Sequence, residues 1–518
     1  MERPRAGRPQ RAELLAALSL AIDLGLGQPL EHMLRSCLIA MKLAELVGAD
    51  PAERETAYYG GLLAWIGCHA DSQEFAELFG DDIAFRAASY EVDWRSPQFA
   101  ALLGRYVGSA RPLPAHAARL ASFALHAQAQ MTSLISSHCV SAGMLAARLG
   151  LPEHVAEGLT FTFERWDGRG LPSGAAGDAI PLGMRIVHLA DVAEVHLRTG
   201  GPEAAVVMAR RRSGTQFDPE LVEVFCTAID DLVPAEEDVW DATIRLAPDS
   251  DRVLTDEELG ELLQAMGDFV DLKSPWTAGH SRLVAELAAR AGAILGLPGP
   301  DQATLRRAGH VLDLGLMGVP NRVWRKTSSL STSEQEHMRL HPYLTRRILS
   351  RVGALRELAP VAGAHHERLD GSGYPQGMSA QELRLPERIL AAADEYQSLR
   401  EPHPPRPAAS PADAAEVLRR QVREGLLDGP AVEAVLAAAG RSRPARGSWP
   451  AGLTDREVEV LRLLARGRST VEVARELTIA PKTARNHVEH IYAKIGTSNR
   501  TGAAMFAVTH GLLGVLPE

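Results

Sequence analysis

Residues 365–375 read His365-His366-Glu367-Arg368-Leu369-Asp370-Gly371-Ser372-Gly373-Tyr374-Pro375, and they carry the strongest chemical signal in the chain. Two adjacent histidines and two carboxylates stand beside a glycine-rich turn that a proline closes. Imidazole and carboxylate groups are the usual protein ligands of a borderline or hard metal ion. Glycine permits the tight backbone that a turn needs where a helix ends. The stretch therefore predicts a metal site, provided that other segments supply further ligands.

The composition predicts a helical protein of several domains. A chain of 518 residues is too long for one hydrophobic core, so we expect about three domains. Hydrophobic residues make up 46% of the chain and aromatic residues only 5%, a balance that favours helices. No apolar run approaches the roughly 18 residues of a membrane-spanning helix, and the four cysteines form no C-x-x-C pair. We expect a cytoplasmic protein with reduced thiols and no membrane contact, and its net charge of −10 means that any nucleic-acid contact comes from a local patch.

The chain contains an internal duplication. His280 follows His32 by 248 positions, and Asp313 follows Trp65 by the same distance. A second constant offset of 203 positions relates seven further pairs: His138 and His341, Glu164 and Glu367, Asp167 and Asp370, Gly168 and Gly371, Gly170 and Gly373, Pro172 and Pro375, Asp191 and Asp394. Two constant offsets predict two copies of one module, and their difference places 45 extra residues in the first copy between Trp65 and His138. The unit is far longer than that of a solenoid repeat.

Proline- and glycine-rich segments indicate where the modules end. Residues 234–251 separate the two copies, and residues 441–452 are typical of a flexible linker. The regular segments have helical periodicity and no convincing strand alternation. We therefore predict an all-α protein with two tandem helical modules over residues 1–240 and 252–440, the linker 441–452, and a helix-turn-helix domain over 453–518.

The second copy resembles the HD-GYP family of metal-dependent phosphohydrolases, an all-helical branch of the HD superfamily. The resemblance rests on HHERLDGSGYP, on Met338-Arg339-Leu340-His341-Pro342 and on Ala392-Ala393-Asp394. Members of that family bind two or three metal ions, often iron or manganese, and many hydrolyse cyclic di-GMP. Carried over residue by residue, the resemblance implies six metal ligands: His280, Asp313, His341, His365, His366 and Asp394.

Three positions depart from the family pattern. Leu312 stands where the signature histidine precedes the aspartate, Leu316 replaces a lysine that would contact phosphate, and Trp276 stands where some members have a glutamate. His310 does not substitute, because two residues along a helix is about 200° around its axis. We expect one divalent ion, iron, manganese or zinc, to be favoured over two, which weakens two-metal catalysis. No catalytic residue is assigned.

The first copy has lost more of the pattern. Ala64 and Trp65 stand at the His-Asp pair, and Thr162 and Phe163 stand at the double histidine. His32, His138 and Asp191 remain, which predicts a scaffold or a ligand-sensing domain. An alternative thiolate site would use Cys68, His69 and Cys139, although such residues usually serve packing.

The segment after Leu453 has a different character. Thr454 precedes Glu457 by three positions, which predicts a capping box at the start of an amphipathic helix. Gly467 ends that helix, a short helix follows over 471–477, and Pro481 opens a third that reaches Ile495. Two short helices, a turn and a third helix with basic residues indicate a helix-turn-helix.

This segment resembles the LuxR-type helix-turn-helix over nearly all of residues 453–513. The resemblance rests on Leu-Thr-x-Arg-Glu-x-Glu-Val-Leu, on Asn486-His487-Val488, and on Lys494-Ile495-Gly496 before Asn499-Arg500. It implies that the third helix enters the major groove of DNA and that the protein forms a homodimer. The implied DNA-binding residues are Lys482, Thr483, Arg485, Asn486, His487, Glu489, Lys494 and Arg500.

Two functions follow from these observations. The first is a DNA-binding transcriptional regulator whose HD-GYP-like region responds to a nucleotide effector or a metal ion. The second is an active metal-dependent phosphodiesterase, of the kind that cleaves cyclic di-GMP, fused to a DNA-binding domain. Leu312 and Leu316 favour the first hypothesis, and the six retained ligands keep the second open.

Overall fold

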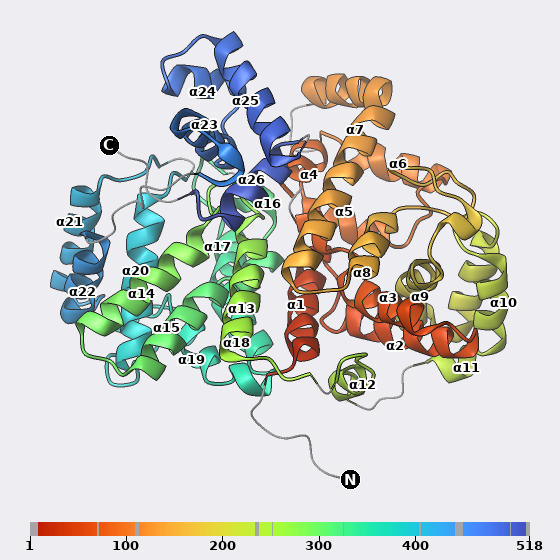
Figure 1. Ribbon diagram of the computed structural model, residues 1–518, viewed down its shortest axis with the longest axis horizontal. Coiled ribbons are helices and arrows are strands. Elements are labelled where there is room, and N and C mark those ends of the chain that lie inside the picture. Colours follow the sequence, from red (N-terminus) through yellow and green to blue (C-terminus); the bar gives the residue numbers. More distant parts are fainter. Residues whose placement is uncertain are drawn as a thin grey trace. The chain divides into compact units, whose positions relative to one another are not determined.

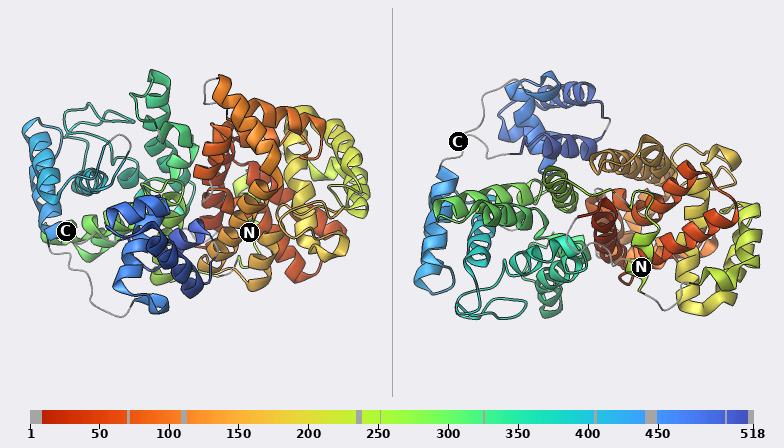
Figure 2. Two further views of the ribbon diagram at one scale, coloured as in Figure 1. Left: turned by 90° about the horizontal axis from the view of Figure 1, so that it is seen from above. Right: turned by 60° about the horizontal axis from the view of Figure 1, so that its bottom comes forward.

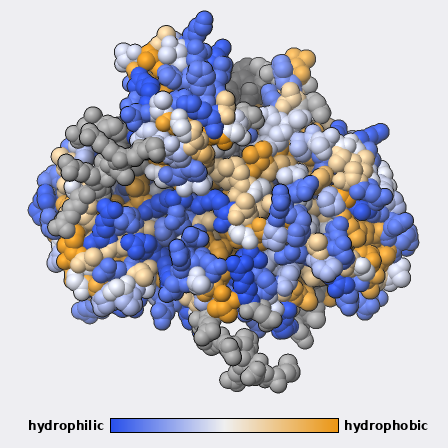
Figure 3. Space-filling model, viewed as in Figure 1, coloured by the Kyte–Doolittle hydropathy of each residue, from blue (hydrophilic) through white to orange (hydrophobic). Residues whose placement is uncertain are grey.

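The computed structural model confirms an all-α fold. It describes residues 9–69, 72–108, 113–233, 238–250, 252–324, 326–403, 406–440, 449–497 and 499–513, and these residues form helices and no β-strand (Figure 1). Contacts divide the chain into two compact units, one built mainly on Arg8–Thr255 and the other mainly on residues 256–319 and 323–518. Most of the predicted linker, 441–448, lies outside the described residues. No described helix combines the length and hydropathy needed to cross a membrane, and the face in Figure 3 mixes hydrophilic and hydrophobic side chains.

The first unit, red to yellow-green in Figures 1 and 2, is a layered helical domain. Its α-helices are α1 (Arg11–Leu26), α2 (His32–Leu46), α3 (Pro51–Leu63), α4 (Ser72–Phe79), α5 (Asp82–Ser89), α6 (Pro97–Tyr106), α7 (Leu113–Arg148), α8 (Glu153–Gly158), α9 (Leu182–Arg212), α10 (Pro219–Thr227), α11 (Ile229–Leu232) and α12 (Val239–Arg245). Short 3-10 turns lie at Ile66–His69, Leu159–Phe161 and Gly177–Ala179. Helix α9 bends at Gly201, whose φ of +75° is non-helical, just before Pro202.

Two hydrophobic clusters stabilise this unit. The first joins α2, α9 and α10 through residues such as Leu43, Leu189 and Phe225, all fully buried. The second holds Phe79, Phe85, Phe99 and Phe123 and is built by α4 to α7. This second cluster occupies the segment where the first copy has its 45 extra residues, so the insertion has a small aromatic core of its own.

The second unit repeats the arrangement and adds four C-terminal helices. Its elements are α13 (Asp256–Asp271), α14 (His280–Ile294), α15 (Gly299–Val311), η4 (Leu314–Gly318), α16 (Asn321–Trp324), α17 (Thr332–Arg339), α18 (His341–Leu349), η5 (Gly353–Leu355), α19 (Leu358–Ala362), α20 (Leu385–Arg400), α21 (Pro411–Arg423), α22 (Gly429–Gly440), η6 (Pro450–Gly452), α23 (Asp455–Ala465), α24 (Thr470–Glu476), α25 (Pro481–Ile495) and α26 (Arg500–Thr509). Helix α16 begins within the short segment that contacts assign to the first unit.

Equivalent positions of the two copies make equivalent contacts. A Cβ added to Gly67 would lie 2.3 Å from the carbonyl oxygen of His138, and one added to Gly315 would lie 2.1 Å from that of His341. Asp23 accepts from the backbone N–H of Met33, as Asp271 accepts from that of Ser281. Both offsets found in the sequence therefore relate residues with the same local role.

The C-terminal bundle has the layout that the sequence indicates. Thr454 and Glu457 form the predicted capping box of α23, and Gly467 follows that helix with a φ of +86°. Pro481 stands in the first turn of α25, which ends at Ile495 before a left-handed Gly496. These helices, blue in Figure 2, enclose a small hydrophobic core of their own.

Candidate functional site

Five segments of the second unit bring the six predicted ligands to one place. His280 opens α14, Asp313 precedes η4, and His341 opens α18. His365 and His366 follow α19, and Asp394 lies on the buried face of α20. Five of the six line a cavity of about 760 Å³, which Trp276 and Leu316 also line. The ligand set drawn from distant stretches of sequence is therefore one spatial cluster.

Three imidazoles form the tightest part of this cluster. One ring nitrogen from each of His341, His365 and His366 lies within 4.8 Å of the others. The Nδ1 atoms of His341 and His365 each lie 2.6 Å from a backbone carbonyl oxygen, of Met338 and Ala362 respectively, so each Nδ1 carries a proton and donates. Their two Nε2 atoms face each other at 3.0 Å. Because these ring nitrogens converge with one from His366 on one point, the donor set fits a metal ion.

Asp313 supplies the carboxylate of this group. Its Oδ1 lies 3.5 Å from His341 Nε2 and 3.6 Å from His365 Nε2. Burial raises the pKa of Asp313 to about 6. Burial and the neighbouring His365 lower the pKa of His341 to about 3, which keeps this imidazole neutral. Three ring nitrogens and one carboxylate make a four-coordinate set.

His280 is in a different electrostatic state. Its Nε2 lies 3.1 Å from Asp394, and its Nδ1 lies 3.0 Å from Glu401. Although burial opposes it, Glu401 and Asp394 raise the pKa of His280 well above the usual value. Both ring nitrogens therefore donate to carboxylates, and a metal ion at this position would have to replace that pairing.

Glu401 was missed by the sequence analysis. It follows Asp394 by seven positions, about two helical turns, and stands directly after the last residue of α20. Gln397 donates to Glu401 at 2.6 Å and holds it toward His280. That helical spacing is the signal that could have found it.

The two leucines that depart from the family pattern are buried. Leu312 is fully enclosed, and Leu316 is 5% exposed. Lys273, also buried, lines a smaller cavity with Asp313 and Leu316, and its Nζ donates to the carbonyl of Met317 at 2.5 Å. Lys273, two residues after the end of α13, thus places an ammonium group near Leu316, and this group is already bonded to the backbone.

The carboxylates within residues 365–375 have a structural role instead of binding metal. Glu367 accepts from the backbone N–H groups of Gln376 and Met378 at 2.7 and 2.9 Å. Asp370 accepts from the N–H and hydroxyl of Ser372. These two carboxylates therefore close the turn, and the carboxylates of the six predicted ligands come from Asp313 and Asp394.

Replacing Gly315 by alanine is expected to destabilise the protein by about 1–3 kcal/mol and to weaken metal binding. The added Cβ would press on the carbonyl of His341, so the backbone that carries this imidazole must move. Gly353 lies in a similar short 3-10 turn with no atom near its Cβ position, which makes Gly353→Ala the matched control. Urea unfolding and metal titration measure the two effects, and equal behaviour of the two variants would contradict the expectation.

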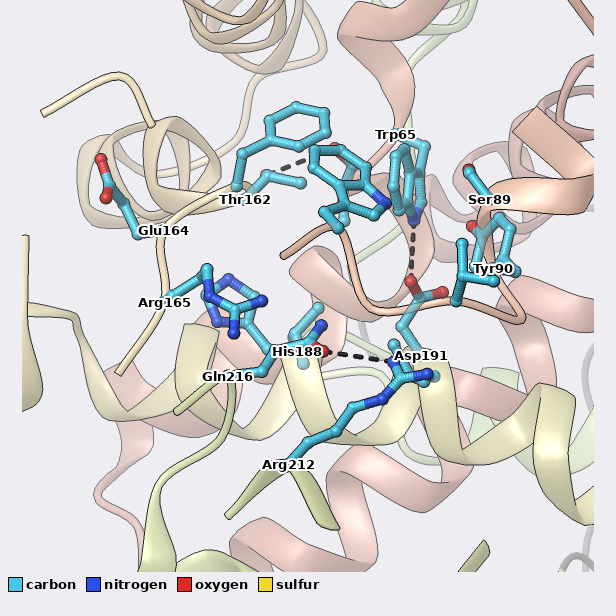
Figure 4. A pocket seen from close by; sticks show the side chains of 16 residues that line it. Trp65, Ser89, Tyr90, Thr162, Glu164, Arg165, His188, Asp191, Arg212 and Gln216 are labelled. Carbon is cyan, nitrogen blue, oxygen red and sulfur yellow. Dashed lines mark hydrogen bonds between the residues drawn. The ribbon is translucent and has the colours of Figure 1, made fainter. Parts of the chain in front are cut away.

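In the first copy, a protonated histidine neutralises two buried carboxylates without a metal ion. His32 lies 3.1 Å from Asp191 and 2.5 Å from Glu194. The indole N–H of Trp65 donates to Asp191 at 3.0 Å (Figure 4). Although burial opposes it, Asp191 and Glu194 raise the pKa of His32 to about 10, so its imidazole is charged. His32 and Asp191, two residues that remain from the ligand pattern, are therefore hydrogen-bonded to each other.

The other candidates of the first copy do not converge on a metal site among the described residues. His138 packs edge-on against Phe163 at 4.7 Å, and burial lowers its pKa to about 3. The thiol of Cys139 donates to the carbonyl of Thr160. The side chains of Cys68 and His69 lie outside the described residues, so the alternative thiolate site stays a prediction.

Helix α25 presents the candidate nucleic-acid interface. Lys482, Thr483, Arg485, Asn486 and Glu489 are exposed along it, and His487 is half-buried. Lys494 is bonded to Glu457 and to the carbonyl of Gly452. Arg500 donates to the carbonyls of Leu464 and Arg468. Lys494 and Arg500 therefore support the packing of the bundle. The five exposed side chains make no contact of this kind with the described residues.

Comparison with known proteins adds two kinds of similarity. The HD-domain family model matches residues 98–221 and 264–430, and the model of the luxR family of bacterial regulatory proteins matches residues 451–507. A 3'3'-cGAMP-specific phosphodiesterase of Vibrio cholerae is 32% identical over 414 residues, covering 78% of this chain and 89% of the relative. A second such enzyme from that organism is 37% identical over 172 residues, which is 33% of this chain and 40% of the relative. The crystal structure of a cyclic GMP-AMP-specific phosphodiesterase of V. cholerae matches with a TM-score of 0.59 and 26% identity, covering 84% of this chain and 99% of that one.

Proposed function

Because this chain belongs to the HD-domain family and ends in a LuxR-type helix-turn-helix domain, we propose that it is a transcriptional regulator whose HD-domain region responds to a bound metal ion or ligand. The observation that carries the proposal is the combination of an intact imidazole cluster with the loss of two groups needed for turnover. A site that still binds but lacks its catalytic partners is suited to sensing.

The metal part of the proposal concerns one divalent ion, iron, manganese or zinc. His341, His365, His366 and Asp313 would hold it, since they offer three nitrogens and one carboxylate oxygen at one point. Such an ion would act as a Lewis acid toward a bound phosphate or water. The second position has His280 engaged with two carboxylates and Leu312 in place of an imidazole, which supports one ion over two.

Coupling to DNA binding has a physical route within the second unit. Leu272 and Ala278 pack against the hydrophobic core of the helix-turn-helix domain. Ala278 lies two residues before His280, at the start of α14. A ligand that binds the two states of this contact unequally shifts the balance between them, and only such a ligand can regulate. Function as a homodimer in the cytoplasm, where the DNA is, belongs to the same proposal.

DNA recognition is tested by selecting operators from random DNA with the full-length protein. We expect an enriched motif, and Arg485→Ala is expected to lose about 1–3 kcal/mol of binding because its exposed guanidinium reads a base edge. The affinity for this motif is expected to change at least about fivefold when the metal ion is removed.

Two lysines of α25 provide a matched comparison in the same assay. Lys482→Ala is expected to reduce the slope of log affinity against log salt by about one, because the exposed lysine neutralises a phosphate. Lys494→Ala should leave that slope unchanged, since its ammonium group is bonded to Glu457. Absence of any enriched motif at low and moderate salt would contradict the regulator proposal.

A second candidate function is a metal-dependent phosphodiesterase. The extensive similarity to enzymes named for 3'3'-cGAMP supports it, as does the convergence of all six donors. Turnover of 3'3'-cGAMP or cyclic di-GMP by the unaltered chain, lost in His365→Ala, would favour this candidate over the sensor.

A further inference from the structure

The first copy contains a cavity that the functions described above do not use. It lies wholly within the first unit and encloses about 690 Å³ of space free of protein atoms, part of it open to solvent. This is within the range of about 300–1,000 Å³ typical of small-molecule sites. The residues that give it chemical character are Trp65, Tyr90, Trp94, Phe163, Arg165 and Arg212.

Aromatic rings form one wall of the cavity. Phe163 lies 5.4 Å from Trp65 in an edge-on contact and 5.3 Å from Trp94 in a tilted one. Tyr90 lies 5.3 Å from Trp65 on the other side. Trp65 and Trp94 are only half-buried, so ring surface remains available to a ligand. Flat aromatic surface of this kind stacks on nucleobases, at about 1–3 kcal/mol per base.

Two guanidinium groups form the opposite side, and they are paired unequally. Arg165 binds Asp93 at 2.8 Å and Asp167 at 3.4 Å. Arg212 is only 7% exposed, and it donates to two neutral acceptors, the Gln216 side chain at 3.2 Å (Figure 4) and the Glu91 carbonyl at 3.3 Å. Among the described residues no carboxylate lies within ion-pair distance of Arg212. Burial lowers its pKa, which reflects the cost of enclosing this charge.

The hydrogen bonds of this buried guanidinium go to neutral groups, and the carboxylate of Asp93, which acts on its pKa, is itself bonded to Arg165. Such a guanidinium beside aromatic surface indicates an anionic aromatic ligand. Arginine binds phosphate through two parallel N–H donors. A cavity lined by charged groups is not a packing void, because voids that stay empty in proteins are apolar. A metal ion is a poor occupant, since the nearby His32 is charged and Asp191 is bonded to His32 and Trp65.

We propose that this cavity binds a purine nucleotide, with the base against Trp94, Phe163 and Trp65 and the phosphate on Arg212. The proposal deepens the sensor function and rests on it for the effect on DNA, but the binding step stands without it. It gives the degenerate copy a ligand of its own, distinct from the metal ion of the second copy.

Calorimetric titration of the full-length protein with GMP and AMP tests the binding step. We expect saturable binding of at least one nucleotide to one site per chain, with guanosine, adenosine and inorganic phosphate at least about tenfold weaker. Arg212→Met should weaken nucleotide binding at least about tenfold. Arg211→Met, at the exposed neighbouring position, should leave it unchanged and is the matched control.

Fluorescence locates the ligand independently of folding effects. Nucleotide is expected to quench tryptophan emission in the unaltered protein, and Trp94→Phe should reduce the amplitude of quenching while retaining affinity, because a ring remains. His366→Ala should retain the site that depends on Arg212. Circular dichroism of each variant establishes that it is folded, and a misfolded Arg212→Met variant leaves the quenching measurement to decide.

The proposal is overturned if neither nucleotide binds at millimolar concentration, if folded Arg212→Met binds normally, or if Trp94→Phe leaves quenching unchanged. Nucleotide binding that does not alter operator affinity would support the site and overturn its part in the sensor function. Metal-dependent operator binding without nucleotide binding would support the sensor function and overturn the site.

Discussion

Replacing His365 by alanine is expected to weaken metal binding by more than about 100-fold while the helical content is retained. His365 is fully buried and its Nε2 faces both His341 and Asp313, so it contacts two of the other proposed ligands. Its loss leaves two imidazoles and one carboxylate around a gap. Elemental analysis of the purified protein and titration with manganese or zinc measure the change.

Two other histidines make this experiment specific. His337 is exposed on α17 and bonds a backbone carbonyl of its own helix, so His337→Ala should bind metal as the unaltered chain does. His280→Ala distinguishes one ion from two. If one ion binds at the imidazole cluster, this variant keeps a stoichiometry of about one per chain. A fall from two ions to one would show that both positions fill and would remove a main argument against catalysis.

The double substitution Leu312→His with Leu316→Lys is expected to raise the phosphodiesterase activity of the chain. The new imidazole would complete the second metal position next to Asp313, and the new ammonium group would stabilise negative charge on the reacting phosphate. A gain of more than about 100-fold over the unaltered chain is expected, since removing one such charge-stabilising group from an enzyme costs about 10²–10³. Hydrolysis of bis-p-nitrophenyl phosphate and of 3'3'-cGAMP provides the measurement.

The same double variant carrying His365→Ala is the control and should be inactive. Each single substitution should give less activity than the pair, because metal activation and charge stabilisation act on one transition state. The sensor hypothesis fails if the unaltered chain already hydrolyses either substrate and loses this activity with His365→Ala. Both leucines are buried, so thermal unfolding of the variants has to be measured alongside.

The sequence was sufficient for features that depend on local spacing. Thr454 and Glu457 form their capping box because the two residues are separated by one helical turn. The six ligand positions were predicted from a family resemblance, and the structure brings their side chains together. The helical fold follows from composition and periodicity, since the rise of a helix fixes which side chains share a face.

Features that depend on contacts between distant segments were not accessible. Glu367 and Asp370 looked as suited to metal as Asp313, and only the turn that they close shows that their oxygens are already used. Arg212 lies far along the chain from Trp94 and carries no motif, so nothing in the sequence places the two in one cavity. Trp65 reads as a lost ligand, but in the structure its indole N–H bonds the aspartate that would have shared a metal with it.

The charged His32 of the first copy has a consequence for how the two halves of the protein respond to their surroundings. Its imidazolium neutralises Asp191 and Glu194 with a proton, which is always present in water, whereas the His341, His365 and His366 cluster of the second copy would need a divalent ion under the proposed function. Two of these three histidines have no histidine at the matching positions of the first copy, Thr162 and Phe163. A chelator would then act on the second copy only, and the first would stay folded and able to bind its ligand.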